Sequence, residues 1–396
     1  MPTRTIALVT VGRSDWGIYR PVAQAIQRDP ELQLRIIATG GHLVPAMGRT
    51  IDEIRADGFT VDEQVDCLLA ADTPLAVAKS MGLATVGLAE AYHRLAPDLV
   101  LVLGDRFEMH AAALAAVPLR LPLAHIHGGE LTIGATDDVL RHAITKYSHL
   151  HFAATEEFAA RIIQMGEEPW RVTVCGAPAL DNLASLKLLS RPELESRLGL
   201  SLERPPLLAT FHPVTLQYDD TEKQVGEFLA ALSEFDLPIV MTRPNADAGN
   251  QTITQQLACF AEQRPNTVVV DNLGSRAYFS LMAVAAAMVG NSSSGIIEAA
   301  SFELPVVNIG IRQEGRPRSR NVLDVGDNRR EIAAALRRAL SPEFRQSLRG
   351  MKNVYSAGGA AARIVNRLKT VELNDKLLLK QFYSPAVNSA GSRIAG

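Results

Sequence analysis

The chain contains a series of short segments that are apolar at nearly every position, each followed by the apolar spacing of a helix. Strands that are apolar throughout are typical of a parallel sheet that helices cover on both faces. Helical spacing lies between them, for example at Leu75–Leu95 and Val139–Tyr147. This alternation predicts a doubly wound α/β domain in the first half. The strands predicted there are Ile6–Val11, Leu34–Thr39, Leu99–Leu103, Pro122–Ile126 and Leu150–Ala154.

The same alternation restarts after residue 206. Residues 191–206 hold three prolines and many charges, which indicates a connection between two domains. A chain of 396 residues has the length of two domains of roughly 100–200 residues each. We therefore expect two Rossmann-like domains, 1–190 and 191–372, followed by a C-terminal tail, 373–396. The strands predicted in the second half are Leu207–Phe211, Pro238–Thr242, Thr267–Val270, Ala287–Val289 and Val306–Ile309.

Composition excludes several classes of partner. Lys and Arg number 40 against 43 Asp and Glu, so we expect neither a nucleic-acid surface nor an anionic-membrane surface. No apolar run reaches the roughly 18 residues of a membrane span. Cys67, Cys175 and Cys259 are far apart and form no CxxC motif. That pattern favours a reducing, cytoplasmic location over a disulfide framework.

Polar, glycine-containing loops follow the predicted strands in both halves. In open α/β sheets ligands bind beyond the carboxyl ends of the strands. Turn chemistry and helix capping explain any one such loop, but so many with Arg, His, Asp or Glu indicate two active edges facing one cleft. These loops are Gly12–Asp15, Gly40–His42, Gly104–Glu108 and His127–Glu130 in the first half, and His212–Thr215, Arg243–Asp247, Gly290–Gly295 and Gly310–Gln313 in the second.

The segment Asn291–Glu298 indicates an anion site. Small polar residues that open a helix leave N–H groups free to bind phosphate, helped by the helix dipole. A plain helix cap by Ser292 is the alternative explanation. Guanidinium groups, which suit phosphate oxygens, follow the next predicted strand at Arg312, Arg316, Arg318 and Arg320. Together these features favour an anionic, nucleotide-like ligand. GxGxxG after the first strand and GxxxxGK[ST] are both missing, which excludes the dinucleotide fingerprint and the P-loop.

Two His-x-His pairs leave a zinc site open as an alternative. His125 with His127, and His149 with His151, would each share one face of a strand. No further Cys or His cluster completes a set of ligands. We therefore expect neither a metal nor another cofactor.

The loops resemble those of the hydrolysing UDP-N-acetylglucosamine 2-epimerases, a family that includes bacterial enzymes of sialic-acid and legionaminic-acid pathways. The resemblance runs from Ile6 to about Leu368. It implies the glycosyltransferase-B architecture, in which two Rossmann-like domains surround a cleft. Its strongest blocks are Gly104–Phe107, Gly128–Glu130, Asp137–Lys146, His212–Thr215, Asn245–Gly249, Gly290–Ser293 and Gly310–Gln313.

The resemblance also implies a reaction. The C2 proton and the nucleoside diphosphate at C1 are lost to give a glycal, and water then adds to release N-acetylmannosamine and UDP. Asp105 and Asp137 are implied as catalytic carboxylates, Glu298 as the partner of the ribose hydroxyls, and the Ser pair as that of the phosphates. The residues implied around the nucleotide are Arg13, Arg106, His212, Asn245, Ser292, Ser293, Glu298 and Arg312.

His127 departs from the family pattern, because several members carry a catalytic Glu at this position. Either His127 takes over the proton transfer, as an imidazole can near neutral pH, or Glu130 serves. The first loop, Gly12–Gly17, also differs in detail, although Arg13 and Asp15 still align.

Several activities stay open on the sequence alone. The substrate could be GDP-N-acetylglucosamine or a UDP-linked 2,4-diacetamido-trideoxyhexose instead of UDP-N-acetylglucosamine. A non-hydrolysing 2-epimerase is disfavoured because Asp137–Lys146 resembles the hydrolysing branch, and a glycosyltransferase would need an acceptor. Asp105 and Asp137 argue against a non-catalytic sensor. We also expect a homodimer or homotetramer.

Overall fold

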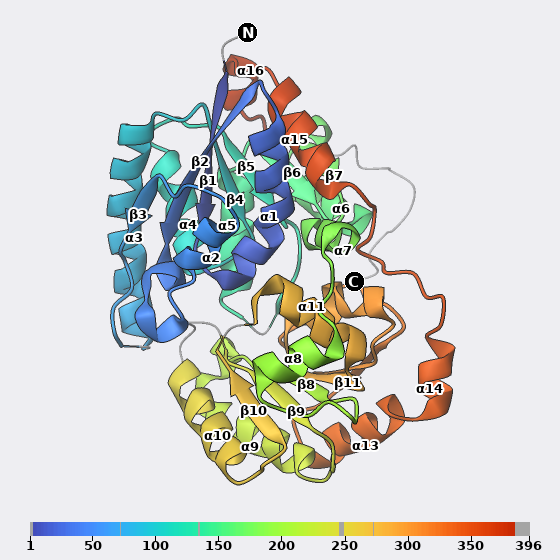
Figure 1. Cartoon of the computed structure of the whole chain (residues 1–396). Coiled ribbons are helices and arrows are strands. Elements are labelled where there is room, and N and C mark those ends of the chain that lie inside the picture. The colour runs from blue at the N-terminus through green and yellow to red at the C-terminus, as the bar shows by residue number, and fades with distance from the viewer. Residues whose placement is uncertain (1–2, 72, 134, 245–248, 272, 385–396) are drawn as a thin grey trace, which may run out of the picture.

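Two parallel sheets, one in each half of the chain, form the two units of the computed structural model (Figure 1). The structure describes residues 3–71, 73–133, 135–244, 249–271 and 273–384. The first sheet has the strand order β3-β2-β1-β4-β5-β6-β7, and the second has β10-β9-β8-β11-β12-β13. Each order reverses at its centre, which is the switch point where doubly wound sheets bind ligands. The predicted α/β fold class is confirmed.

The first unit follows the predicted strands closely. Its central strand β4 is buried at every position, as its apolar sequence predicts, and side chains of α1, α3 and α4 pack on the sheet. The strands are β1 (Arg4–Thr10), β2 (Leu32–Thr39), β3 (Glu63–Val65), β4 (Leu99–Leu103), β5 (Leu123–Ile126), β6 (Leu150–Ala153) and β7 (Val172–Val174). The helices are α1 (Arg13–Arg28), α2 (Ile51–Ala56), α3 (Pro74–Leu95), α4 (Phe107–Ala116), α5 (Asp137–Tyr147), α6 (Glu156–Gln164) and α7 (Asp181–Ser185).

The second unit repeats the arrangement with a smaller sheet. Its strands are β8 (Leu207–Thr210), β9 (Ile239–Thr242), β10 (Thr267–Val270), β11 (Ala287–Gly290), β12 (Val306–Ile309) and β13 (Val322–Val325). Its helices are α8 (Arg191–Leu198), α9 (Thr221–Leu232), α10 (Asn250–Glu262), α11 (Gly274–Val284), α12 (Ser293–Ile297), α13 (Arg329–Ala339) and α14 (Pro342–Ser347).

Three strands were not predicted. β3, β7 and β13 lie at the edges of their sheets and are only partly buried. An edge strand does not need apolar residues on both faces, so its sequence lacks the pattern used for prediction. The predicted connection 191–206 also begins with a helix: Leu194 and Leu198 of α8 belong to a core cluster of the second unit.

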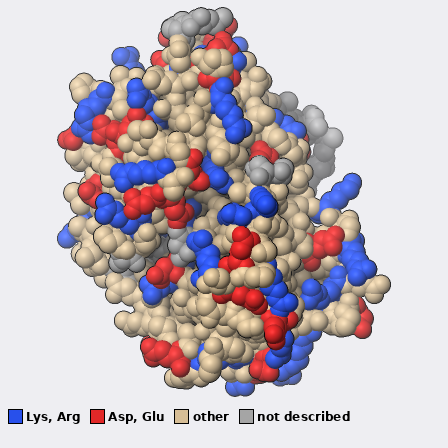
Figure 2. Space-filling view, viewed as in Figure 1, with Lys and Arg blue, Asp and Glu red and all other residues tan. Residues whose placement is uncertain are grey.

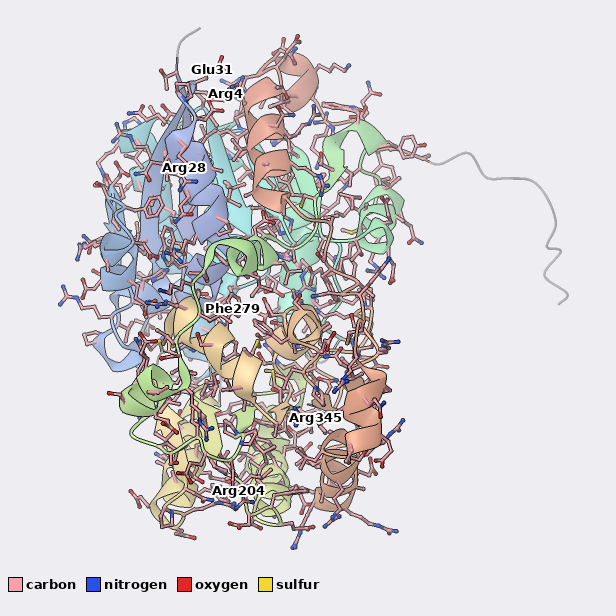
Figure 3. All side chains as sticks on the ribbon, turned by 45° about the vertical axis from the view of Figure 1, so that its right-hand side comes forward. Arg4, Arg28, Glu31, Arg204, Phe279 and Arg345 are labelled. Carbon is pink, nitrogen blue, oxygen red and sulfur yellow. The ribbon has the colours of Figure 1, made fainter. Side chains whose placement is uncertain are left out.

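The end of the chain returns to the first unit. α15 (Ala360–Thr370) packs along α1, and its Ile364 and Leu368 join the core beneath the first sheet. Arg4 donates a hydrogen bond to the carbonyl of Lys369 at 3.0 Å, at the top of Figure 3. The last helix of the predicted unit 191–372 therefore packs with the first unit.

The described part of the predicted tail, residues 373–384, is also held on the first unit. It begins with α16 (Asp375–Leu378), and the fully buried Arg171 donates to the carbonyl of Leu377 at 2.8 Å. Lys380 lies 2.7 Å from the buried carboxylate of Glu167. These buried charges are paired, as burial requires.

The surface carries mixed charge. On the face drawn in Figure 2, Lys and Arg alternate with Asp and Glu and do not form a broad patch of one sign. Among the described helices, none combines the length and apolar character that crossing a bilayer requires.

Candidate active site

Two adjoining cavities lie where the carboxyl ends of the two sheets meet. The larger, of about 650 Å³, is enclosed mainly by loops of the first unit and by the start of α10. The smaller, of about 170 Å³, is enclosed mainly by the second unit, and Phe279 lines it near the junction of the units (Figure 3). Arg13, Ser14 and Arg243 line both cavities, so the two form one site.

The loops after β8 and β11 build the smaller cavity. Gly290 has φ +135°, and a Cβ there would lie 1.8 Å from the carbonyl oxygen of Thr210, so only glycine fits. The next residue, Asn291, is fully buried and joins the loops: its Oδ1 accepts from the backbone N–H of His212 at 2.7 Å, and its Nδ2 donates to the His212 carbonyl at 2.8 Å. These loops contribute the polar residues Thr210, His212, Ser292, Ser293, Ser294 and Glu298 to its lining, and the second unit adds Thr242, Arg243, Ser275 and Tyr278.

Hydrogen bonds join the loop after β12 to the loop after β11. Arg312 and Gln313 donate to the carbonyl of Asn291 at 3.3 and 2.9 Å. Ser292 accepts from the backbone N–H of Ser294 at 3.4 Å, so its alternative role as a helix cap is confirmed. Because α12 has only five residues, anion binding here would rest on hydroxyl, N–H and guanidinium groups more than on a helix dipole.

Glu298 is the titratable carboxyl of the smaller cavity. Burial raises the pKa of Glu298 to about 7, and contacts with Ser294, His127 and Arg316 oppose that rise. Glu298 therefore exchanges a proton near neutral pH. Its interaction with His127 also places it within electrostatic reach of the first unit.

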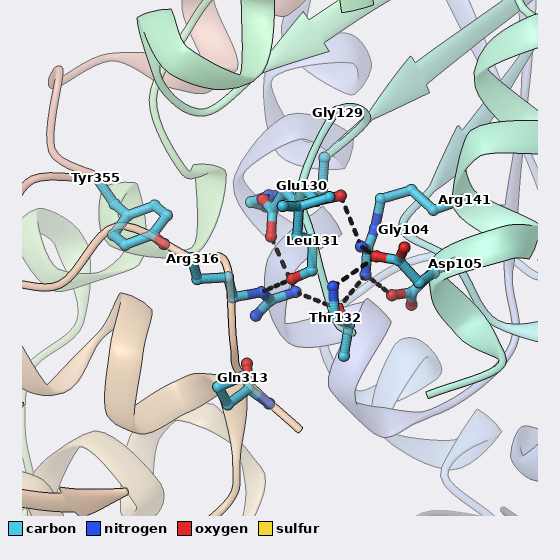
Figure 4. A network of polar contacts seen from close by, with 12 residues as sticks. Gly104, Asp105, Gly129, Glu130, Leu131, Thr132, Arg141, Gln313, Arg316 and Tyr355 are labelled. Atoms are coloured by element: carbon cyan, nitrogen blue, oxygen red, sulfur yellow. Dashed lines mark hydrogen bonds and ion pairs between the residues drawn. The ribbon is translucent and has the colours of Figure 1, made fainter. Parts of the chain in front are cut away.

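A charged network lies at the edge of the first sheet (Figure 4). Asp105, after β4, forms an ion pair with the fully buried Arg141 of α5. Arg141 also donates to the Glu130 carbonyl at 2.9 Å and to Thr132 Oγ1 at 2.7 Å, and Asp138 Oδ1 lies 3.3 Å away. The side chain of Asp105 is 22% exposed. A rigid guanidinium thus fixes a carboxylate that solvent can still reach.

His127 and Glu130 form a pair directly after β5. His127 has φ +64°, a conformation that is rare for a residue with a side chain and is held here by its surroundings. Its Nδ1 lies 2.5 Å from Glu130 Oε1, and Glu130 Oε2 lies 2.9 Å from Arg316 Nη2 of the second unit. Burial alone raises the pKa of Glu130, but Arg316 and His127 outweigh it and hold the pKa below its usual value.

The predicted residues of the first unit fall in two places. The network at the sheet edge contains Asp105, His127 and Glu130. Arg13 and Arg106 line the larger cavity: Arg13 donates to the carbonyl of Asp271, and Arg106 lies 3.3 Å from Glu108. Asp137 is the half-buried first residue of α5.

The predicted residues of the second unit gather around the smaller cavity. His212, Ser292, Ser293 and Glu298 line it, and Arg312 is buried beside Asn291. Asn245 lies outside the described residues.

Sequence reasoning missed the roles of three members of the network: Asp138 and Arg141 were not singled out, and Arg316, expected at phosphate oxygens, pairs with Glu130. Asp138 and Arg141 lie three residues apart on α5, a spacing that puts them on one face of a helix and could have revealed them. Arg316 was one of four arginines in its loop, and nothing local distinguishes it from its neighbours.

The histidines of the zinc alternative have other partners. His125 Nε2 lies 2.8 Å from the Gly104 carbonyl, and His149 Nδ1 accepts from the backbone N–H of Leu123 at 3.0 Å. His151 lies 3.1 Å from Glu167. Within the part of the chain that the structure describes, no three His, Cys, Asp or Glu side chains are grouped as metal ligands.

Two relatives with assigned names align with this chain over nearly its whole length. The chain is 39% identical over 385 residues to a protein of Campylobacter jejuni named GDP/UDP-N,N'-diacetylbacillosamine 2-epimerase (hydrolyzing), covering 96% of this chain and 99% of that one. It is 37% identical to UDP-N,N'-diacetylbacillosamine 2-epimerase (hydrolyzing) of Legionella pneumophila, covering 95% and 98%.

Solved structures agree on the fold. UDP-GlcNAc 2-epimerase from Neisseria meningitidis superposes with a TM-score of 0.78 at 19% identity, covering 92% of this chain and 99% of that one. A calicheamicin glycosyltransferase superposes with a TM-score of 0.52 at 16% identity, covering 93% and 98%. The expected glycosyltransferase-B architecture is confirmed.

A sequence model described as UDP-N-acetylglucosamine 2-epimerase matches residues 24–369, and the chain belongs to this family.

Proposed function

We propose that the chain is a hydrolysing nucleotide-sugar 2-epimerase whose sugar is a 2,4-diacetamido-2,4,6-trideoxyhexose carried on UDP or GDP. The observation that supports this proposal most directly is the sequence identity, over nearly the whole length, to two proteins named as hydrolysing epimerases of this sugar. The products are the nucleoside diphosphate and a free sugar inverted at C2.

The reaction begins with an elimination. A base removes the proton from C2, the electron pair of that bond forms the C1–C2 double bond of a glycal, and the bond from C1 to the diphosphate oxygen breaks. One water then adds its hydroxyl to C1 while a proton returns to C2 on the opposite face. The steps need a base near C2 and donors that stabilise the leaving diphosphate.

We assign the base to His127. Its Nδ1 is engaged by Glu130, whereas its buried Nε2 has no hydrogen-bond partner among the described residues. A neutral imidazole that donates from one nitrogen carries a lone pair on the other. Nε2 is therefore the atom suited to take the C2 proton.

Two carboxylates at the edge of the first sheet complete the proposed catalytic groups. Asp105, fixed by Arg141, stabilises the positive charge that develops at C1 as the diphosphate leaves. Asp137, at the start of α5, steers the incoming water, while Asp138 helps to hold Arg141 in place.

The smaller cavity holds the nucleotide. Ser292 and Ser293, which line it, bind the diphosphate together with Arg312, which is buried beside Asn291, and Glu298 binds the ribose hydroxyls. His212, Arg13 and Arg106 surround the link to the sugar, because they line the two adjoining cavities. Asn245 is assigned to the nucleotide on the family resemblance alone.

The wall of the larger cavity suits a deoxygenated sugar. Its lining includes the apolar side chains of Val44, Met47, Leu68, Val77 and Phe107. A C6 methyl group gains from such a wall, whereas a C6 hydroxyl would lose hydrogen bonds to water there. UDP-N-acetylglucosamine is the second candidate substrate, because the matching family model carries its name.

The test is a comparison of substrates. The enzyme is incubated separately with UDP-N-acetylglucosamine and with the UDP- and GDP-linked diacetamido sugars, and both products are identified by NMR. We expect a higher kcat/KM for a diacetamido sugar, with release of nucleoside diphosphate and no need for added metal or NAD. Faster turnover of UDP-N-acetylglucosamine would select the second candidate, and loss of activity with chelator would revive the histidine–metal alternative.

We place this reaction in the cytoplasm. All three cysteines are free, and Cys67 and Cys175 are buried as thiols, which fits a reducing compartment.

We propose a homodimer through α3 and α4. These helices pack together, and with the turn after α4 they leave large apolar side chains exposed, namely Leu83, Val86, Leu114, Val117 and Leu119. Sedimentation of the wild type and of Val86→Glu tests this. We expect a dimer that the substitution weakens, whereas a wild-type monomer would contradict it.

A further inference from the structure

Glu130 is enclosed on both of its carboxylate oxygens. Oε1 meets His127 Nδ1 at 2.5 Å, and Oε2 meets Arg316 Nη2 at 2.9 Å. Its side chain is 1% exposed. Both carboxylate oxygens of Glu130 are engaged by neighbouring side chains, whereas His127 keeps one ring nitrogen without a partner among the described residues, so Glu130 acts on the reaction through its neighbours.

The first neighbour is His127, whose tautomer Glu130 sets. A carboxylate at Nδ1 accepts the N–H of that nitrogen and leaves Nε2 unprotonated, which is how orienting carboxylates work in other histidine bases. The buried Nε2 has no hydrogen-bond partner among the described residues that would compete for this arrangement.

The second neighbour, Arg316, belongs to the other unit. Its Nε also donates to the carbonyl of Leu131 at 3.1 Å, and its side chain is 7% exposed (Figure 4). The same loop carries Arg312 and Gln313, which hold the carbonyl of Asn291 beside the serines of the smaller cavity. The loop after β12 therefore contacts the nucleotide side of the site through Arg312 and Gln313, and it contacts Glu130, the partner of the proposed base, through Arg316.

We infer that Glu130 is a positioning residue, and that Arg316 couples it to the nucleotide side of the site. The position of the loop after β12, which carries Arg316, determines the orientation and the charge of the His127–Glu130 pair. The catalytic meaning of this coupling rests on the proposed function. The charged and titratable groups around the pair are His125 and Arg141 of the first unit, with Arg316, Glu298 and Tyr355 beyond it.

The first test is the pH profile of kcat/KM, whose acid limb reports the essential base. Glu130→Gln removes a negative charge beside His127, disfavours the imidazolium form and should move the acid limb to lower pH. Arg316→Met removes the cation that competes for Glu130 and should move the limb to higher pH. Arg337→Met is the control, because Arg337 pairs with Glu234 on the surface of the second unit.

Opposite shifts in the two variants, with an unchanged limb in the control, support the coupling. A merely structural role predicts slower turnover with the limb in place, and that result would overturn it. Thermal melting of each variant separates loss of fold from loss of positioning.

The second test does not need turnover. The ¹⁵N signals of His127, identified by their loss in His127→Gln, are recorded with and without UDP. We expect an unprotonated Nε2, and a UDP-dependent change in the Nδ1–H signal of the wild type that Arg316→Met lacks. Protonation on Nε2, or an equal response in Arg316→Met, would contradict the inference. If the wild type releases no nucleotide from any sugar, the proposed function fails while this test still stands.

Discussion

The two sheets meet the same site with different chemistry. The first-sheet edge is a network of buried charges, in which Arg141 and Arg316 hold the carboxylates of Asp105 and Glu130. The second-sheet edge offers mostly small neutral groups, with Asn291 and Ser293 among them. Both sheets have the same reversing strand order. The loops therefore decide the chemistry, and the scaffold decides only where it happens.

This difference matches the two tasks of the reaction. Buried charges are costly to assemble, but once paired they give fixed groups for proton transfer and charge stabilisation. Hydroxyl and backbone N–H groups let a bulky diphosphate approach closely. We expect substitutions at the first edge to reduce the rate, and those at the second edge to reduce affinity.

The largest effect is expected for Asp105→Asn at the first edge. Asparagine is nearly the same size but carries no charge, so turnover should fall about 10²–10⁴-fold while nucleotide affinity is retained. Steady-state kinetics and calorimetry with UDP measure the two separately. Asp52→Asn is the matched control, because Asp52 pairs with Arg55 at 3.0 Å on the surface. A near-normal rate would remove Asp105 from the mechanism.

A large effect is also expected for His127→Gln. Glutamine keeps the size and some hydrogen bonding but cannot carry the proton, so kcat should fall roughly 10²-fold or more and the acid limb of the pH profile should disappear. His93→Gln on the exposed end of α3 serves as the control. If the rate stays near normal, the proton transfers belong to Asp105 and Asp137 instead.

At the second edge, Ser293→Ala should act mainly on binding. Losing one donor to a charged diphosphate costs roughly 1.5–3 kcal/mol, which is about 10–150-fold in affinity. Some loss of kcat should accompany it, because the diphosphate is also the leaving group. Ser347→Ala, on the exposed surface of α14, is the control. Unchanged UDP affinity in Ser293→Ala would place the phosphate site elsewhere.

The smallest effect concerns stability at the second edge. Burial raises the pKa of Glu298 to about 7 from 4.5, so between these values the folded chain binds more protons than the unfolded chain. The free energy of unfolding contributed by Glu298 therefore falls as the pH rises through this window. Glu298→Gln removes that loss and should raise Tm by a few degrees at pH 8, with no gain at pH 4. A Tm gain that does not depend on pH would contradict this, and exposed Glu222→Gln is the control.

The sequence predicted those structural features that a local pattern of residues determines. Leu99–Leu103 was predicted because a strand buried on both faces is apolar throughout, and a helix cap at Ser292 was open as the alternative to a phosphate ligand because caps have a fixed chemistry. β3 was not predicted, because an edge strand carries polar residues such as Glu63 and Gln64.

Tertiary placement accounts for the remainder of the site. Arg141 is fully buried, whereas a local pattern assigns arginine to the surface. The contact of Arg316 with Glu130 joins residues 186 positions apart, and it exists only because the two units face each other. The role of α15 was missed for the same reason, since its packing on α1 joins opposite ends of the chain.

Turnover in D₂O tests the central claim that the two edges act together in one elimination. The enzyme is given the UDP-linked diacetamido sugar, and the released sugar is examined by NMR and mass spectrometry. The account predicts UDP and a free 2-epimerised sugar with one deuterium at C2, because the abstracted proton exchanges with solvent before water adds across the glycal. Product with only hydrogen at C2, or an epimerised sugar still bound to the nucleotide, would contradict it.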